Sequence, residues 1–174
     1  IFDMLEMSNK TSEEVFSLLD NLLKWTKSQL GKLTVIPQKL DISGLADGVV
    51  EVMNSVAEVK HIKLIRTDHE SFFVYVDIEM IKSILRNLIS NAVKFSNPDS
   101  EIKVGIKAED GKVIVSVTDS GKGIKKEDQH KLLKDSTHFT TYGTNSEEGS
   151  GLGLLLCRDF ARKNGGELWF ESEE

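Results

Sequence analysis

The chain has 174 residues, of which 39% are hydrophobic and 29% are charged, enough for one domain with a full core and an appended element. Its net charge of −6 argues against a nucleic-acid-binding protein, and its single cysteine, Cys157, excludes an internal disulfide. No apolar run approaches the roughly 18 residues of a membrane-spanning helix. Because the sequence begins with Ile1 rather than Met and ends on Glu173-Glu174 inside what looks like a strand, we expect a fragment of a longer protein. The single cysteine favours a reducing, cytosolic setting.

The first predicted element is a helix over residues 11–30. Thr11 and Glu14 have the spacing of a capping box, and Gly31 is a natural stop. Helical spacing of apolar residues predicts one buried stripe, formed by Val15, Leu18, Leu19, Leu22, Trp25 and Thr26.

A short strand over residues 40–42 and a second helix are expected next. We expect Ser43 to cap this helix. Its apolar side comprises Leu45, Ala46, Val49, Val50, Met53, Val56 and Ala57. Two strands follow, over residues 62–66 and 72–76, and Asp77 is placed to cap a third helix that runs to about Phe95.

A β-hairpin is the clearest local pattern. Residues 102–106 and 113–117 alternate between apolar and polar side chains, and Asp110-Gly111 is a tight-turn pair. The polar segment 125–149 is typical of a functional lid or mobile loop. A fourth helix over 154–163 and a strand starting within 167–171 complete an α/β pattern, in which helices cover one side of a mixed, largely antiparallel sheet.

Three polar groupings suggest chemistry, and the first lies on the third helix. Asn87, Asn91 and Lys94 fall within about 40° of one another around the helix axis, beside the apolar row. Amide oxygens can bind Mg²⁺, and a lysine can meet phosphate. The alternative is a solvated helix face with two incidental asparagines.

The second grouping follows the last strand of the hairpin. Asp119 keeps the parity of the inward-facing valines, so we expect it to point inward and to need a donor, such as an exocyclic amine. Gly121 and Gly123 permit positive φ and the close approach of a ligand. A plain turn at the end of a strand is the alternative.

The third grouping is the run Gly149, Gly151 and Gly153 at the start of the fourth helix. A glycine-rich helix start presents N–H groups to an anion, aided by the helix dipole. The alternative is a flexible linker. Neither G-x-x-x-x-G-K-S/T nor G-x-G-x-x-G occurs in the sequence, so the two most familiar phosphate-binding loops are excluded.

Order and spacing together give these segments a family resemblance. Residues 87–96 resemble the N box of histidine kinases, and residues 119–124 resemble their G1 box. Residues 139–144 look like the F box and lid, and residues 149–154 look like the G2 box. The resemblance spans residues 40–174 and points to the histidine kinase branch of the ATPases that also include gyrase and a heat-shock chaperone.

The resemblance implies a Bergerat-type fold, a two-layer α/β sandwich in which a mixed sheet packs on helices and ATP lies beneath a mobile lid. It also implies a domain division. Residues 1–36 would be the C-terminal part of the dimerisation and phosphoacceptor hairpin with its linker. Residues 37–174 would be the ATP-binding catalytic domain, with its last strand truncated.

The resemblance also implies roles for individual residues. Asp119 would bind the adenine amino group, and Asn91 would bind Mg²⁺ with help from Asn87. Together with Lys94, these two asparagines would form the catalytic set. The other implied ATP-binding residues are Phe95, Gly121, Gly123 and Ile124 around adenine; Phe139, Thr140, Thr141, Gly143 and Thr144 in the lid; and Gly149, Ser150, Gly151, Leu152 and Gly153 around the phosphates.

The implied activity is that of a histidine protein kinase that uses ATP and Mg²⁺. The γ-phosphoryl group would pass to a histidine on the dimerisation hairpin and then to an aspartate of a response regulator. His61, His69, His130 and His138 lack the acceptor pattern, so we expect the acceptor to lie outside this sequence. The intact protein would be a homodimeric, membrane-anchored sensor with this domain in the cytoplasm, while the fragment could be a monomer.

Two alternatives to the kinase function stay open. One is a hydrolysing ATPase of the same fold, although such relatives carry a glutamate where Asn87 stands here, and an amide cannot act as that general base. The other is a non-enzymatic module that binds nucleotide or docks partners.

Overall fold

The computed structural model describes residues 15, 19–28, 30–132, 143–144 and 151–174. Residues 19–28 are helical. The elements that follow are β1 (Gln38–Asp41), α2 (Ile42–Glu58), β2 (Lys63–Arg66), β3 (Phe73–Val76), α3 (Ile78–Phe95), β4 (Glu101–Glu109), β5 (Lys112–Thr118), α4 (Lys126–Gln129) and α5 (Gly153–Lys163). The predicted helices and the hairpin are therefore confirmed within the described ranges.

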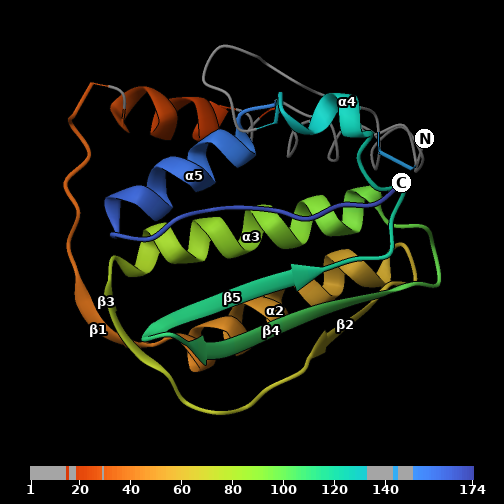
Figure 1. Ribbon diagram of the computed structural model, residues 1–174, viewed down its shortest axis with the longest axis horizontal. Coiled ribbons are helices and arrows are strands. Elements are labelled where there is room, and N and C mark those ends of the chain that lie inside the picture. The colour runs from red at the N-terminus through yellow and green to blue at the C-terminus, as the bar shows by residue number, and fades with distance from the viewer. Residues whose placement is uncertain (1–14, 16–18, 29, 133–142, 145–150) are drawn as a thin grey trace, which may run out of the picture.

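The strands form two sheets. In the three-stranded sheet β2 runs parallel to β4, and β4 pairs antiparallel with β5; β1 and β3 form a separate antiparallel pair. Asp110 and Gly111 both have positive φ, 50° and 74°, as the tight hairpin turn requires. In Figure 1 the larger sheet lies in front of α2, with α3 and α5 stacked above it.

The main core lies between this sheet and the pair α2–α3. Ile102, Val104 and Ile106 are fully buried on β4, and the register pairs Val104 with Val117, so the hairpin valines share the inner face. Leu85 and Ile89 meet this face from α3. The predicted two-layer α/β sandwich, with helices on one side of a mixed sheet, is confirmed.

A second apolar cluster joins α3 to α5 and to the N-terminal helical segment. Its buried members are Met80, Leu156 and Phe160, against which Trp25, Leu33, Val35 and Ile84 pack. Ser28 donates a hydrogen bond to Asp159 of α5, and the Cys157 Sγ lies 3.8 Å from the Ile84 carbonyl oxygen. Residues 19–36 are therefore attached to the two helices that carry Asn87 and Gly153.

Apart from Trp25, the described residues of the stripe predicted to be buried on the N-terminal helix are exposed, so this part of the prediction is wrong. Val15, Leu19 and Leu22 are exposed, and Leu19 keeps 58% of its surface. Thr26 is also exposed, and Leu18 lies outside the described residues. The reason is that only one side of the helix, around Trp25, has a packing partner among the described residues.

Helix caps fix where α2 and α3 begin. The Asp77 carboxylate accepts from the Met80 N–H at 3.1 Å and from the Ile36 N–H at 2.9 Å, so the predicted cap of α3 also holds the preceding linker. The cap of α2 is Asp41 rather than Ser43, because the helix starts at Ile42 and the Asp41 Oδ1 accepts from the Ser43 N–H. The Ser43 hydroxyl bonds instead to the Glu70 carbonyl.

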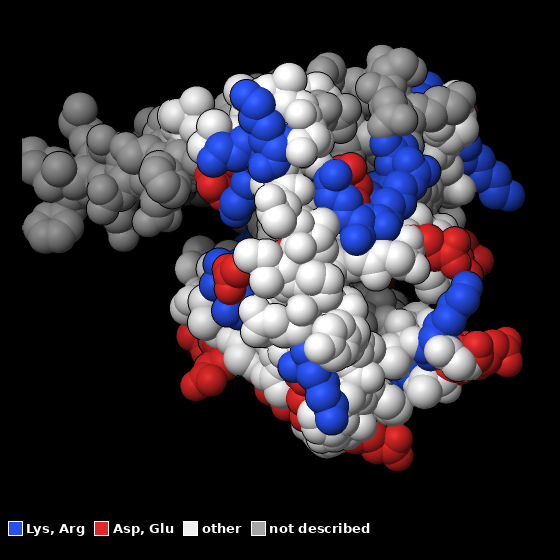
Figure 2. All heavy atoms as spheres, turned by 90° about the vertical axis from the view of Figure 1, so that its left-hand side faces the viewer, with Lys and Arg blue, Asp and Glu red and all other residues white. Residues whose placement is uncertain are grey.

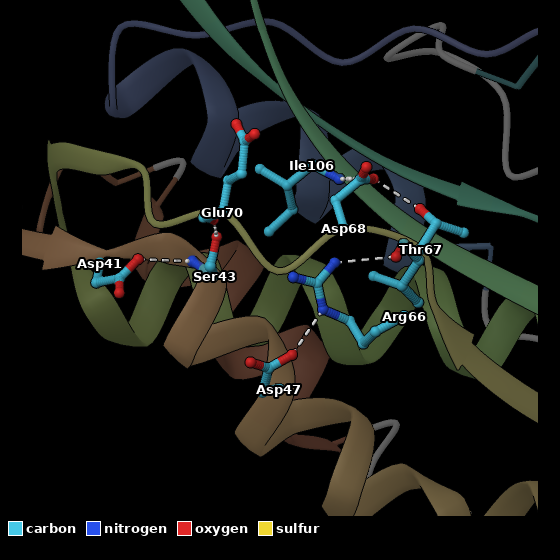
Figure 3. A network of polar contacts seen from close by, with 9 residues as sticks. Asp41, Ser43, Asp47, Arg66, Thr67, Asp68, Glu70 and Ile106 are labelled. Carbon is cyan, nitrogen blue, oxygen red and sulfur yellow. Dashed lines mark hydrogen bonds and ion pairs between the residues drawn. The ribbon is translucent and has the colours of Figure 1, made fainter.

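Beyond the end of β2, polar side chains make hydrogen bonds to the backbone of β4 (Figure 3). Arg66 donates to the Val104 carbonyl and forms an ion pair with Asp47 of α2 at 2.7 Å. Asp68 then accepts from the Ile106 N–H. These contacts tie the loop after β2 to both β4 and α2. In Figure 1 this loop runs along the bottom of the view, away from the C-terminus.

Residues 166–174 differ from the predicted strand at 167–171. They are extended and run alongside β5 (Figure 1), but they form no strand pairing among the described residues. Side chains hold the segment instead: Lys112 pairs with Glu167 at 3.5 Å, and the Ser172 hydroxyl accepts from the Ile124 N–H.

Figure 2 shows where charge gathers on one side of the molecule. Lys and Arg side chains lie in the upper part, over the N-terminal helical segment and the C-terminal end of α5, whose last turn holds Arg162 and Lys163. Basic groups favour a helix C-terminus, so this cluster needs no ligand to explain it. Among the described residues, no helix combines the length and apolarity that crossing a membrane requires.

The reactivity of Cys157 tests the packing of α5 on α3. Burial raises the pKa of this thiol to about 12, so at pH 8 it is almost wholly protonated. We expect alkylation by iodoacetamide at pH 8 to be at least about a hundredfold slower in the folded chain than in urea, where the same single cysteine is exposed. Equal rates in the two conditions would show that α5 does not pack as described.

Candidate functional site

One edge of α3 carries the first predicted grouping. Asn87, Asn91 and Lys94 are all half-buried and lie on successive turns, as predicted. The Asn87 amide nitrogen donates to the Ser83 carbonyl at 2.9 Å, which leaves its oxygen facing away from its own helix. The Asn91 side chain makes no hydrogen bond to the parts of the chain that the structure describes. Both amide oxygens are therefore available to a ligand.

The glycine-rich start of α5 lies against this edge. A Cβ added to Gly153 would stand 3.0 Å from the Asn87 Oδ1, closer than nearly all real Cβ contacts. Gly151 has a positive φ of 67°, and Leu152, the N-cap residue, supplies no side-chain acceptor to the first-turn N–H groups. Helix N–H groups without a side-chain cap are suited to an anion.

The segment that contains Asp119 lies against the other end of α3. The Lys122 N–H donates to the Phe95 carbonyl at 3.3 Å, and a Cβ on Gly121 would come within 2.4 Å of that same carbonyl oxygen. A side chain at position 121 would therefore separate this segment from α3. The absence of a side chain, rather than an unusual backbone angle, is what the site requires here.

Asp119 does not point inward, contrary to the sequence prediction. It is exposed, and its Oδ1 accepts from the Gly121 N–H at 2.8 Å. Strand parity fails because β5 ends at Thr118 and the chain then turns toward the end of α3. The carboxylate is thus partnered by its own turn, and it retains acceptor capacity for a second donor.

Gly123 does have the predicted positive φ, 66°, but the group that approaches it belongs to the chain itself. A Cβ there would stand 1.9 Å from the Glu173 carbonyl oxygen. The neighbouring Ile124 N–H is bonded to Ser172 at 2.9 Å. Gly123 and Ile124 therefore anchor the C-terminal segment beside the Asp119 turn.

The Phe95 ring is flanked by two lysines. The ammonium groups of Lys94 and Lys122 lie 5.2 and 5.1 Å from the ring centroid. Sequence reasoning identified Lys94 but missed Lys122, although the position of Lys122 between two predicted site glycines was a usable signal. Two cations beside one ring make this end of α3 locally positive in an acidic chain.

Thr144 joins the same place from the predicted lid. Its N–H donates to the Lys94 carbonyl at 3.1 Å, and its hydroxyl donates to the Ser96 carbonyl at 2.8 Å. Gly143 is also described and half-buried. The other predicted site residues of this region, Phe139, Thr140, Thr141, Gly149 and Ser150, lie outside the described residues.

The three predicted groupings therefore all lie along α3. Asn87, in the middle of this helix, lies beside Gly153. Lys94 and Phe95, in its last turn, lie beside the turn that contains Asp119. No three His, Cys, Asp or Glu side chains gather at a metal-binding spacing within the described ranges. The groups on this edge of α3 that could hold a metal are the amide oxygens of Asn87 and Asn91, which suit a hard cation shared with phosphates.

The chain is similar to a known family of ATPases and to sensory kinases. The family of histidine kinase-, DNA gyrase B-, and HSP90-like ATPases matches residues 76–174. The adaptive-response sensory kinase SasA of Crocosphaera subtropica is 34% identical over 157 residues, which cover 89% of this chain and 41% of that protein. The chain thus spans about two fifths of the length of this relative.

Solved structures agree with the fold. The catalytic domain of histidine kinase ThkA is 29% identical with a TM-score of 0.68, covering 80% of this chain and 89% of that one. A complex of ThkA with response regulator protein TrrA has a TM-score of 0.71 at 22% identity, with coverage of 96% and 46%. Full-length ShkA with AMPPNP has a TM-score of 0.70 at 23% identity, with coverage of 90% and 32%.

Substituting Gly121 tests the contact between the Asp119 turn and α3. Gly121→Ala places a methyl group against the Phe95 carbonyl, and we expect the free energy of unfolding in urea to fall by about 1–3 kcal/mol. Gly48→Ala is the matched control, because a Cβ there meets nothing within 4 Å and α2 should gain about 0.5–1 kcal/mol. A Gly121→Ala protein as stable as the unsubstituted chain would contradict this contact.

Proposed function

The chain belongs to the family of histidine kinase-, DNA gyrase B-, and HSP90-like ATPases and carries the ATP-binding catalytic domain of the sensor histidine kinases; from this premise we propose how its residues hold the nucleotide and what reaction the whole protein performs. The observation that carries the proposal is the convergence of the Asn87 edge, the Asp119 turn and the Gly153 helix start along α3.

Adenine lies at the C-terminal end of α3 in this proposal. Asp119 accepts from the exocyclic amine with the carboxylate capacity that its bond to Gly121 leaves free. Because Gly121 has no side chain, its segment can lie directly against the Phe95 carbonyl. The Phe95 ring offers an apolar surface to the base. Gly123 and Ile124 shape the pocket indirectly, because they hold the adjoining C-terminal segment.

The phosphates extend toward the start of α5. N–H groups from Gly151 to Gly153 cradle them, and Lys94 supplies a positive charge. Asn91 and Asn87 offer amide oxygens to Mg²⁺. This fit is supported by the Asn91 amide, which has no hydrogen-bond partner among the residues that the structure describes, and by the orientation of the Asn87 oxygen toward Gly153. When bound, Mg²⁺ would neutralise phosphate charge. We also assign phosphate or lid contacts to Phe139, Thr140, Thr141, Gly143, Thr144, Gly149 and Ser150.

Transfer to a protein side chain is favoured over hydrolysis. Asn87 occupies the position from which a general base would have to activate water, and its amide cannot accept that proton. Positioning and charge stabilisation by Asn87, Asn91 and Lys94 are sufficient for phosphoryl transfer. We therefore propose that the whole protein transfers the γ-phosphoryl group to a histidine that lies outside this chain.

Residues 1–36 are proposed to be the end of the dimerisation hairpin and its linker, with residues 37–174 forming the ATP-binding domain. The exposed apolar face of the N-terminal helix supports this division, since Leu19, Leu22 and Leu23 have no cover among the described residues. The first hairpin helix and a second subunit would bury that face. The acceptor histidine would then lie on that first helix.

We further propose that a response-regulator aspartate receives the phosphoryl group from the histidine. Support comes from the similar fold of ThkA, whose complex with response regulator protein TrrA is known. The domain is proposed to face the cytoplasm, where ATP is available and the single thiol stays reduced. A membrane anchor in the intact sensor is part of the same proposal.

Asp119→Asn tests the adenine contact. We expect it to weaken binding of AMPPNP by about 1–3 kcal/mol in calorimetric titrations, because a charge-assisted hydrogen bond is lost. Asp110→Asn is the matched control: the same chemical change in the hairpin turn, where asparagine tolerates the positive φ, should leave binding unaltered. Equal affinity of the Asp119→Asn and unsubstituted chains would reject the assignment of Asp119.

Labelling with radioactive ATP tests the proposed acceptor. The chain alone should remain unlabelled, whereas a hairpin carrying the acceptor histidine should become labelled when it is mixed with the chain and Mg²⁺. Loss of that label in Asn91→Ala would support the metal assignment. Steady phosphate release without labelling of the hairpin would favour a hydrolysing ATPase, and binding with neither reaction would favour a non-enzymatic module.

A further inference from the structure

Lys60 is a buried lysine that the sequence patterns did not single out. It follows α2 in the chain, and only 6% of its surface is exposed. Its ammonium nitrogen lies 3.0 Å from the Val93 carbonyl oxygen, 3.0 Å from the Lys94 carbonyl oxygen and 2.8 Å from the Thr144 hydroxyl. All three acceptors are oxygens, which suit the N–H donors of an ammonium group.

The acceptors belong to the two segments that the nucleotide site needs. Val93 and Lys94 carry two of the last four carbonyls of α3, which no helical N–H can satisfy. Thr144 is one of the two described residues of the predicted lid, and it bonds separately to the Lys94 and Ser96 carbonyls. One buried charge therefore joins the end of α3 to the base of that segment.

A buried charge at this place needs a reason beyond stability. Transferring an ammonium out of water is costly, and a well-packed apolar side chain would often serve a fold as well. What an apolar residue could not do is bond α3 and Thr144 at the same time. The negative end of the α3 dipole further favours a cation at this position.

We propose that Lys60 is a positioning residue for the bound nucleotide. By fixing the last turn of α3 and Thr144 to each other, it sets where Lys94 and Phe95 stand relative to Gly143 and Thr144. Lys60 itself does not touch the nucleotide. This inference rests on the proposed function, because it assumes that the nucleotide lies between the end of α3 and the segments joined to it.

A double-mutant cycle measures this coupling. Lys60→Met removes the ammonium at similar length, and Thr144→Val removes only the hydroxyl. Titration with AMPPNP and Mg²⁺, well below the unfolding temperature of each variant, should give a Kd about tenfold higher for each single variant. The loss of affinity in the double variant should be smaller than the sum of the two single losses, because both substitutions break the same Lys60–Thr144 contact. Lys63→Met, at an exposed lysine three residues further on, is the matched control and should bind as the unsubstituted chain does.

A spectroscopic readout separates positioning from stability alone. In a chain with ¹⁵N-labelled lysines, the side-chain ammonium signal of Lys60, assigned through its own backbone, should shift when AMPPNP and Mg²⁺ are added, while that of Lys63 should not. This measurement, together with Thr144→Val, holds even if Lys60→Met does not fold.

The possible results are distinct. Unchanged affinity in both single variants, additive losses in the double variant, or a Lys60 signal that ignores the nucleotide would each overturn the role of Lys60 while leaving the nucleotide site intact. Failure of the unsubstituted chain to bind AMPPNP would overturn the proposed function and, with it, this inference.

Discussion

The candidate site depends on the C-terminal turn of α3, because the carbonyl groups there accept hydrogen bonds from segments that lie far apart in the sequence. The Phe95 carbonyl holds the Asp119 turn through the Lys122 N–H, and the Lys94 and Ser96 carbonyls hold Thr144. Lys60, which follows α2, donates hydrogen bonds to the Val93 and Lys94 carbonyls of the same turn. Carbonyl groups that the helix itself leaves without N–H partners thus hold together the segments of the proposed binding site.

The opposite half of α3 links the site to the N-terminal helical segment. Met80 and Ile84 of α3 pack with Leu156 and Phe160 of α5, and Trp25 covers the same cluster. Asn87 and Gly153 lie one turn further along this packed pair of helices. Because a close-packed cluster transmits strain, a displacement of the Trp25 helix would change the spacing between Asn87 and Gly153, for which we propose contacts with the metal and the phosphates.

Much of the fold was predictable from local patterns, but contacts between distant segments were not. The period of the hairpin and the Asp77 cap are local signals, and both were confirmed. The inward direction of Asp119 was wrong because strand parity ends with the strand. Gly123 illustrates the same limit: its positive φ was predictable, whereas its neighbour, Glu173, was not. Lys60 has no pattern at all, since only the fold brings it to α3.

The central claim is that three separated segments hold one nucleotide, and a single NMR titration tests it most directly. AMPPNP with Mg²⁺ should shift the backbone amides of Gly121 and Gly153 and the side-chain amide of Asn91 with one shared midpoint, because one molecule contacts all three. Different midpoints for these signals, or a Gly121 amide that stays unchanged while Gly153 shifts, would contradict the account.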